Sequence, residues 1–344
     1  MALQFNAPKA GLIYGPSDTG KTSQFGFMAE WIYRKYGKTT RLISADGGGW
    51  APLAAHIELG IIEPYSVLDS PAPLETLSFL LQGHWPYKDG KPVKLGTRDS
   101  EPTSTTWDKV GAYGIEGLYS ISTLLMQFLS NNGQLASMAG GAQAKGQGVL
   151  SQIKDGSDTW TQAGVGFYNF ILQKMGKYVI QSSALPVHKV LWTSLIGVYE
   201  RRKGEEVIEH GPWGPLMVGQ QGIRVVPQWF GDLIHFDIVH EAVIAEDRPD
   251  RNKSVPAAKV GTVQKKVRAY LKSHTHHKDG ELVPAKPRVP PDQYHKLPAY
   301  KDFAAEEGFI GWLYDQEDTL ENCAVDALRE RLRAPVEAAS PASK

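Results

Sequence analysis

One short segment constrains the fold of this chain more than any other. Residues 15–22 read Gly-Pro-Ser-Asp-Thr-Gly-Lys-Thr and fit the pattern G-x-x-x-x-G-K-[ST]. The apolar stretch 9–14 (KAGLIY) predicts a strand before this segment, and the amphipathic stretch 22–36 predicts a helix after it, ending at Gly37. A strand, a glycine-rich turn and a helix in this order predict a βα unit of a mostly parallel sheet.

The same turn has the chemistry of a phosphate site. Its glycines let backbone N–H groups surround a phosphate, and the following helix directs its positive end there. Lys21 adds a positive charge at the β- and γ-phosphates, and the Thr22 hydroxyl is a ligand for Mg²⁺. We therefore predict that the turn binds ATP with Mg²⁺. The predicted nucleotide-binding residues are Gly15, Pro16, Ser17, Asp18, Thr19, Gly20, Lys21, Thr22 and Ser23.

A site of this kind needs a carboxylate on a neighbouring strand to hold Mg²⁺ through its water shell. The apolar segment 110–116 (VGAYGIE) predicts a strand that ends in Glu116. We predict that Glu116 is this second metal-site residue. Asp is commoner at such a position, and the alternative is that Glu116 caps the helix that follows.

The first half of the chain alternates short apolar runs with amphipathic stretches, the pattern of repeated βα units. Further strands are predicted at 39–45, 189–193 and 233–243, and further helices at 74–82, 118–129 and 164–182. Segment 267–273 is predicted to be an edge strand, and 303–332 a helical terminus followed by a frayed tail.

Several of these segments together resemble the RecA-like recombinase core, in its phage-encoded form. The resemblance is carried by GPSDTGKTS, RLISAD, KVLWTSLIGVYE and GPLMVGQQGIRVVPQWFGDLIHF, and it covers roughly residues 9–245. It implies that Asp46 polarises the attacking water as a general base, although the family usually has Glu there. The alternative is that Asp46 caps the next segment. The resemblance also implies a γ-phosphate sensor at Thr193 or Ser194, where the family typically has an amide.

The expected fold is thus α/β, a RecA-like P-loop NTPase core whose mostly parallel sheet is flanked by helices, with a C-terminal extension. We expect the core over 1–245, a basic, proline-rich linker with the edge strand over 246–301, and an acidic helical C-terminus over 302–344. The linker is basic because 248–301 holds 13 Lys/Arg against four Asp/Glu, although the net charge of the 344-residue chain is zero. Such a block faces a polyanion or is a solvated surface.

Two glycine-rich loops, 131–166 and 203–222, occupy positions like those of the DNA-contacting loops of RecA-like enzymes. The alternative is that both are linkers with solvated charges. Arg201, Arg202 or Lys203 is also suited to act on the γ-phosphate of a neighbouring subunit. The residues predicted to contact phosphates are Lys145, Lys154, Arg201, Arg202 and Lys203, with Trp160 and Trp213 for base stacking.

Two other residue patterns are not predicted to form a metal site or a catalytic site. His274, His276 and His277 have a spacing that suits zinc, but no fourth ligand is evident, and the single cysteine, Cys323, has no base partner. With one cysteine the chain cannot form an internal disulfide, and no apolar run approaches 18 residues. We expect a cytoplasmic protein, in the host cytoplasm if phage-encoded.

The sequence therefore predicts an ATPase that acts on single-stranded DNA in recombination, annealing or repair. We expect a homo-oligomeric ring or filament that works with phage recombination or replication proteins. Two alternatives stay open: an ATP-driven DNA motor or packaging ATPase, and a nucleotide-gated assembly subunit with little turnover.

Overall fold

A computed structural model describes residues 10–47, 50–132, 150–155, 158–163, 165–203, 206–219, 221–243, 262–304 and 307–333. Eight of the described strands form one sheet, in the order β16-β13-β12-β1-β9-β6-β2-β3. The six strands from β12 to β3 are parallel. On the other side of β12, β13 pairs antiparallel with β12, and β16 pairs antiparallel with β13. The strands are β1 (Ala10–Tyr14), β2 (Thr39–Ser44), β3 (Ile62–Ser66), β6 (Val110–Glu116), β9 (Lys189–Ser194), β12 (Asp232–Val243), β13 (Thr262–Tyr270) and β16 (Tyr300–Phe303).

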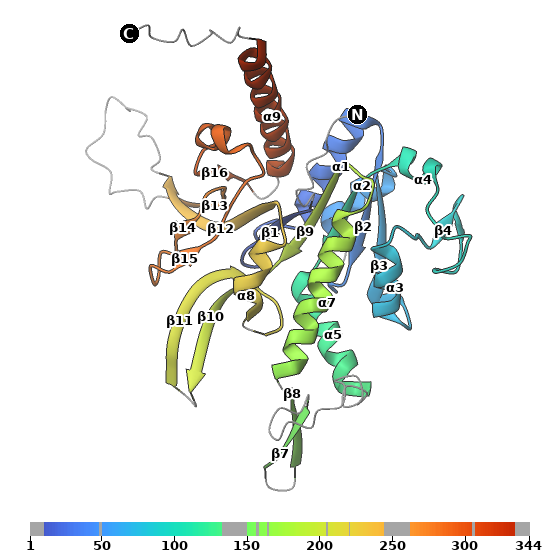
Figure 1. Cartoon of the computed structure of the whole chain (residues 1–344), viewed down its shortest axis with the longest axis vertical. Coiled ribbons are helices and arrows are strands. Elements are labelled where there is room, and N and C mark those ends of the chain that lie inside the picture. Colours follow the sequence, from blue (N-terminus) through green and yellow to red (C-terminus); the bar gives the residue numbers. More distant parts are fainter. Residues whose placement is uncertain are drawn as a thin grey trace, which may run out of the picture.

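Helices cover both faces of this sheet, so the fold is a three-layered α/β arrangement (Figure 1). Because side chains alternate along a strand, Leu12 of β1 packs into one core with α3, α5 and α7, while Ile13 packs into another with α1 and α9. The helices are α1 (Ser23–Tyr36), α2 (Ala54–Glu58), α3 (Pro73–Leu80), α4 (Ser104–Lys109), α5 (Leu118–Asn132), α7 (Val165–Ser183), α8 (Gln221–Val225) and α9 (Phe309–Arg333).

Helix α1 buries an apolar face that its sequence pattern predicts. Phe25, Met28, Ala29 and Ile32 recur at helical spacing and are all fully buried. The helix ends at Gly37, which adopts a left-handed conformation (φ 65°) and whose N–H donates to the Tyr33 carbonyl at 2.8 Å. The predicted end of this helix is therefore confirmed.

The C-terminal helix α9 lies along α1. The side chain of Gln24 bonds twice to the start of α9: its Oε1 accepts from the Ile310 N–H at 3.0 Å, and its Nε2 donates to the Glu307 carbonyl at 3.2 Å. Farther along, Lys189 of β9 and Glu317 of α9 form a buried ion pair at 2.8 Å. The last described helix is thus joined to the first helix and to the sheet.

Most of the predicted elements are confirmed within a few residues. The predicted segments 9–14, 39–45, 110–116, 189–193 and 233–243 correspond to β1, β2, β6, β9 and β12, and 74–82, 118–129 and 164–182 correspond to α3, α5 and α7. The predicted terminal helix 303–332 begins later, at Phe309, because Tyr300–Phe303 is strand β16.

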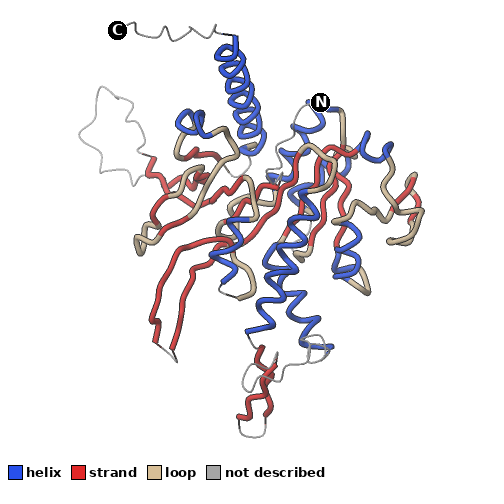
Figure 2. Tube along the Cα trace, viewed as in Figure 1, coloured by secondary structure: helices blue, strands red, loops and turns tan. Residues whose placement is uncertain are grey.

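Three predictions are wrong. The segment 131–166, predicted to be a loop, contains the antiparallel hairpin of β7 (Leu150–Asp155) and β8 (Asp158–Ala163). The segment 203–222 is largely not a loop: β10 (Ile196–Lys203) and β11 (Glu206–Pro215) form a long antiparallel hairpin that projects from the sheet in Figures 1 and 2. Strand β13, predicted to be an edge, is covered on its outer side by β16. Shorter two-stranded pieces are β4 (Tyr87–Lys88) with β5 (Lys91–Pro92), and β14 (His274–Thr275) with β15 (Leu282–Val283).

Candidate phosphate-binding site

The turn at 15–22 joins the carboxyl end of β1 to α1 and packs directly against the sheet. A Cβ on Gly15 would lie 2.2 Å from the Phe236 carbonyl oxygen of β12, so only glycine fits there. The Gly15 N–H donates to the Ser194 carbonyl of β9 at 3.3 Å. Two residues have a left-handed backbone, Asp18 (φ 60°) and Gly20 (φ 73°). The turn is therefore fixed by the backbones of both neighbouring strands.

Lys21 lies inside this turn. Its ammonium donates to the carbonyls of Gly15, at 3.1 Å, and of Pro16. The fully buried Thr19 hydroxyl donates to the same Pro16 carbonyl at 3.0 Å. Burial lowers the pKa of Lys21 to about 8, although the nearby acids Asp18, Asp46 and Glu116 oppose the shift. The ammonium is mostly charged at pH 7 and is held by acceptors that an incoming anion would replace.

Glu116 is joined to the turn, although it is 94 positions away from Thr22 in the sequence. Thr22 Oγ1 donates to Glu116 Oε1 at 2.5 Å, and Ser44 Oγ donates to Glu116 Oε2 at 3.0 Å. Burial raises the pKa of the Glu116 carboxyl, and the two hydrogen bonds counteract part of this shift. The two residues predicted to form the metal site, Thr22 and Glu116, therefore lie in direct contact.

Ser44 is a residue of this site that the sequence analysis missed. It is the last residue of β2 and the register partner of Glu116 in β6. Its side chain is buried, and its Oγ accepts from the Asp46 N–H at 3.0 Å while it bonds to Glu116. Ser44 thus connects the carboxylate to the backbone that leads to Asp46.

Asp46 lies two residues beyond the end of β2, at the same edge of the sheet, and its side chain is exposed. A Cβ on Gly117 would lie 3.5 Å from the Asp46 Cβ, which places Asp46 beside the end of β6. The next helical turn begins at Ala51 with Trp50 as its N-cap residue, so Asp46 does not cap that turn. The alternative of a capping acid is therefore wrong for Asp46.

The end of β9 completes the edge. The Thr193 hydroxyl accepts from the Gly117 N–H at 3.2 Å, and the Ser194 hydroxyl donates to the Leu216 carbonyl at 2.8 Å. Because Tyr14 and Ser194 are register partners, as are Ser44 and Glu116, the ends of β1, β9, β6 and β2 align. The carboxyl ends of parallel strands are where α/β proteins bind ligands.

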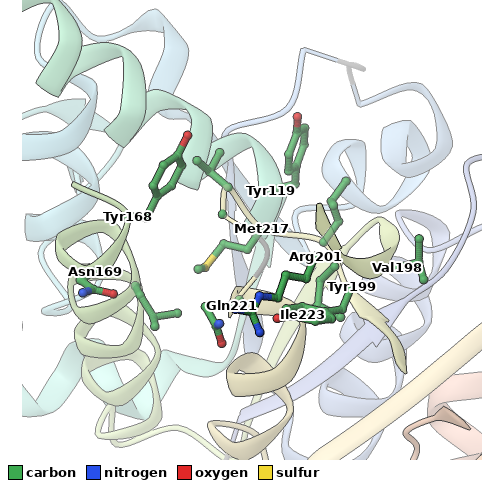
Figure 3. A pocket seen from close by; sticks show the side chains of 14 residues that line it. Tyr119, Tyr168, Asn169, Val198, Tyr199, Arg201, Met217, Gln221 and Ile223 are labelled. Carbon is green, nitrogen blue, oxygen red and sulfur yellow. The ribbon is translucent and has the colours of Figure 1, made fainter. Parts of the chain in front are cut away.

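A cavity of about 820 Å³ lies next to this edge, because Leu216, which accepts the Ser194 bond, lines it. Figure 3 shows this cavity. Tyr119 of α5, Tyr168 of α7 and Tyr199 of β10 line it, and the Arg201 side chain points into it. Its wall at 216–219 is joined to the site through the bond between Ser194 and Leu216. The same wall is joined to α5 because the Val218 N–H donates to Ser122 Oγ at 3.0 Å.

The other predicted DNA-contacting residues have varied positions. Arg201 is exposed and lies 4.0 Å from Glu209 across the hairpin. Trp213 donates to Asp279 at 2.7 Å and stacks on His276 with ring centroids 4.1 Å apart, so it already has partners within the chain. Lys145 lies outside the described residues. The side chains of the other candidates also lie outside what the structure describes: Lys154, Trp160, Arg202 and Lys203.

Of the three clustered histidines, His274 packs against β12 and β13. His274 stacks on Tyr270 and on the buried His235 of β12. Burial lowers the pKa of His235 to about 3, and His274, His276 and Lys21 add to the shift, so its imidazole is neutral at pH 7. Over the described ranges, no three His, Cys, Asp or Glu residues are placed to hold a metal ion. Cys323 is exposed on α9.

Comparison with protein-family models and with curated proteins found no match to this chain. Among the helices of the described residues, none is long and apolar enough to cross a membrane.

Proposed function

We propose that the chain binds ATP at residues 15–23 and hydrolyses it with Mg²⁺. The observation that carries this proposal is the 2.5 Å contact between Thr22 Oγ1 and Glu116 Oε1 beside the Lys21 ammonium. A hydroxyl, a carboxylate and a lysine at the start of a helix are the groups that phosphoryl-transfer sites use to bind Mg²⁺ and phosphates.

The residues present fit Mg²⁺. The metal prefers oxygen ligands, and it usually keeps several waters while binding one or two carboxylates and the substrate phosphates. Thr22 would hold the ion directly and Glu116 through its water shell, and the bound ion would neutralise charge on the β- and γ-phosphates. Lys21 would replace its bonds to the Gly15 and Pro16 carbonyls with bonds to phosphate oxygens.

Asp46 is the proposed general base. Its carboxylate is exposed and lies near Lys21 and Glu116, at the edge of the sheet where the phosphates would lie. Ser194 and Thr193 end the strand between β1 and β6, and we propose that this strand senses the γ-phosphate. These roles follow the RecA-like resemblance stated above.

We further propose that the protein is a phage-encoded RecA-like ATPase acting on single-stranded DNA as an oligomer. The cavity beside Ser194 supports this proposal, because three tyrosines and Arg201 line it and stacking on aromatic side chains is a common way to bind unpaired bases. A DNA motor or packaging ATPase has the same phosphate chemistry and is the first alternative.

A nucleotide-gated assembly subunit is the second alternative. It is favoured by Asp46, which is a methylene shorter than the usual glutamate and whose exposed carboxylate would hold an attacking water less firmly. ATP hydrolysis measured with and without single-stranded DNA separates the three functions. Several-fold stimulation supports the recombination function, DNA-independent turnover the motor, and tight ATP binding without turnover the assembly subunit.

A further inference from the structure

A second cavity lies at the opposite edge of the sheet from the phosphate site. It has a volume of about 650 Å³ and surrounds the amino ends of β3 and β6 and the Arg41 side chain of β2. Its walls come from α2, the β4–β5 hairpin and α4. This size is typical of pockets that bind small organic molecules, and none of its residues belongs to the phosphate site.

A fixed arginine forms part of this cavity. Arg41 is 6% exposed and lies over the Trp85 ring, with 4.6 Å from its guanidinium carbon to the ring centroid. Its Nη1 donates to the Tyr113 hydroxyl at 2.9 Å, and its Nε donates to Glu63 at 3.2 Å. Because these contacts fix the guanidinium plane, the cavity presents a preorganised cation beside an aromatic wall.

Two lysines extend the positive charge to the mouth of the cavity. Lys88 comes from the β4–β5 hairpin and Lys109 from the end of α4, and neither has an ion-pair partner in the described part of the chain. The carboxylate of Glu63 is already bonded, to Arg41 and to the Thr39 hydroxyl at 3.2 Å. Asp89, at the hairpin turn, is the remaining acid of the lining. The charges left for a ligand are therefore predominantly positive.

The hairpin that carries Lys88 is a tight turn. Asp89 (φ 52°) and Gly90 (φ 75°) both have a left-handed backbone, as a two-residue hairpin of this type requires, and Lys88 pairs with Lys91 across it. The half-exposed ring of Tyr87 precedes it, and both Tyr87 and Trp85 line the cavity. The Trp85 ring and the Arg41 guanidinium are held in place before a ligand arrives, which lowers the entropic cost of binding.

We propose that this cavity binds a small organic anion with a flat apolar ring. The ring packs against Tyr87 and the partly exposed Ile57, and the acidic group lies between Lys88 and Lys109. The cavity is separate from the phosphate site, so the anion binds whether or not ATP does.

The test uses 8-anilinonaphthalene-1-sulfonate, a flat aromatic anion whose fluorescence rises on burial, titrated into the full chain. The double variant Lys88→Glu/Lys109→Glu should bind the probe at least about tenfold more weakly, because two attractive charges become repulsive. Tyr87→Ala, a change at a half-exposed ring that preserves charge, should weaken binding several-fold. Lys21→Ala should leave probe binding unchanged.

Two controls make the result specific. Lys94→Glu/Lys278→Glu makes the same change of charge at two exposed lysines outside the cavity, and it should stay within twofold of the parent. Tyr168→Ala alters the cavity near Ser194 instead. Equal losses in both double lysine variants, or loss only in Tyr168→Ala, would overturn the proposal, as would a parent protein that does not bind the probe.

Discussion

Ser44 Oγ donates a 3.0 Å hydrogen bond to Glu116 Oε2, and this bond determines how the Glu116 carboxylate is presented to Thr22. Thr22 donates to the other oxygen, Oε1. Both oxygens of the carboxylate are therefore held, one by the turn before α1 and one by β2. A buried carboxylate that loses one such bond has a higher pKa and a less fixed orientation.

Replacing Ser44 with Ala should therefore weaken the apparent affinity for Mg²⁺. We expect the Mg²⁺ concentration for half-maximal ATP hydrolysis to rise about fivefold, while stability falls by about 1 kcal/mol. The matched control on β2 is Thr40→Val, because the buried Thr40 hydroxyl has no hydrogen-bond partner among the described residues. An equal effect in Thr40→Val would mean that Ser44 acts only through the packing of β2.

Lys21 gives a pH prediction. With a pKa of about 8, its charge is present below that pH and is lost as the pH rises through it. We expect ATP affinity to fall between pH 7.5 and 9.5, by roughly tenfold per unit above the pKa. Lys21→Arg keeps its charge over this range and should show a flat profile, and Lys21→Ala should lose binding while the fold survives. If Lys21→Ala binds ATP as tightly as the parent, the site assignment is wrong.

Asp46→Asn should lower kcat and leave nucleotide affinity within a few-fold. A general base is needed for the chemical step and contributes little to binding of the substrate. Steady-state kinetics and equilibrium binding of ATP separate the two effects. Unchanged hydrolysis would remove Asp46 from the mechanism.

The DNA proposal predicts a salt dependence. Each phosphate neutralised on a single strand contributes a slope of about −0.7 in a plot of log affinity against log salt, so four to six contacts give roughly −3 to −4. The variant Arg201→Ala/Arg202→Ala/Lys203→Ala should flatten this slope by about two units for every sequence alike. If these residues act on a neighbouring subunit instead, the variant loses ATP turnover without DNA while the slope stays the same.

The buried pair Lys189–Glu317 predicts a non-additive effect on stability. Burial alone would lower the pKa of Lys189, but the nearby Glu317 and Asp232 outweigh it, and the pKa is raised. Burial and the neighbouring Asp232 also raise the pKa of Glu317, against the effect of Lys189, so Lys189 is the group that favours the ionised form of this carboxyl. Lys189→Met leaves Glu317 and Asp232 without their cation and should cost about 3–5 kcal/mol in denaturant unfolding. The double variant Lys189→Met/Glu317→Leu should recover most of this loss. Additive losses would show that the pair is not coupled.

Local patterns predicted the part of the site that lies in one segment. The strand, turn and helix around residues 15–22 could be predicted because the motif and both flanking periodicities lie within 30 residues. Glu116 was found because an acid at the end of an apolar strand is a visible signal. Ser44 could not be found, since its role depends on its register against Glu116, and a serine ending a strand carries no signal of its own.

The errors in the fold have a similar cause. Gly211 and Gly214 made 203–222 resemble a loop, but both lie in β11. Glycine is needed there because a Cβ would lie 2.7 Å from the Tyr199 side chain and 2.9 Å from the Ile223 carbonyl oxygen, respectively. Strand β13 is covered because β16, about 30 residues later, pairs with it. Close packing and distant pairing both depend on the folded structure, and a local pattern does not contain them.

The bonds between Gln24 and the start of α9 make the end of the chain a support for its beginning. Gln24 follows Thr22 by two residues, and its side chain is held by Glu307 and Ile310. Shortened versions of the protein that stop before residue 307 would therefore lose ATP binding even though every predicted nucleotide contact remained. Deletion mapping would then assign a nucleotide contact to α9 that the helix does not make. Point variants within residues 15–23 are the sounder way to locate the site.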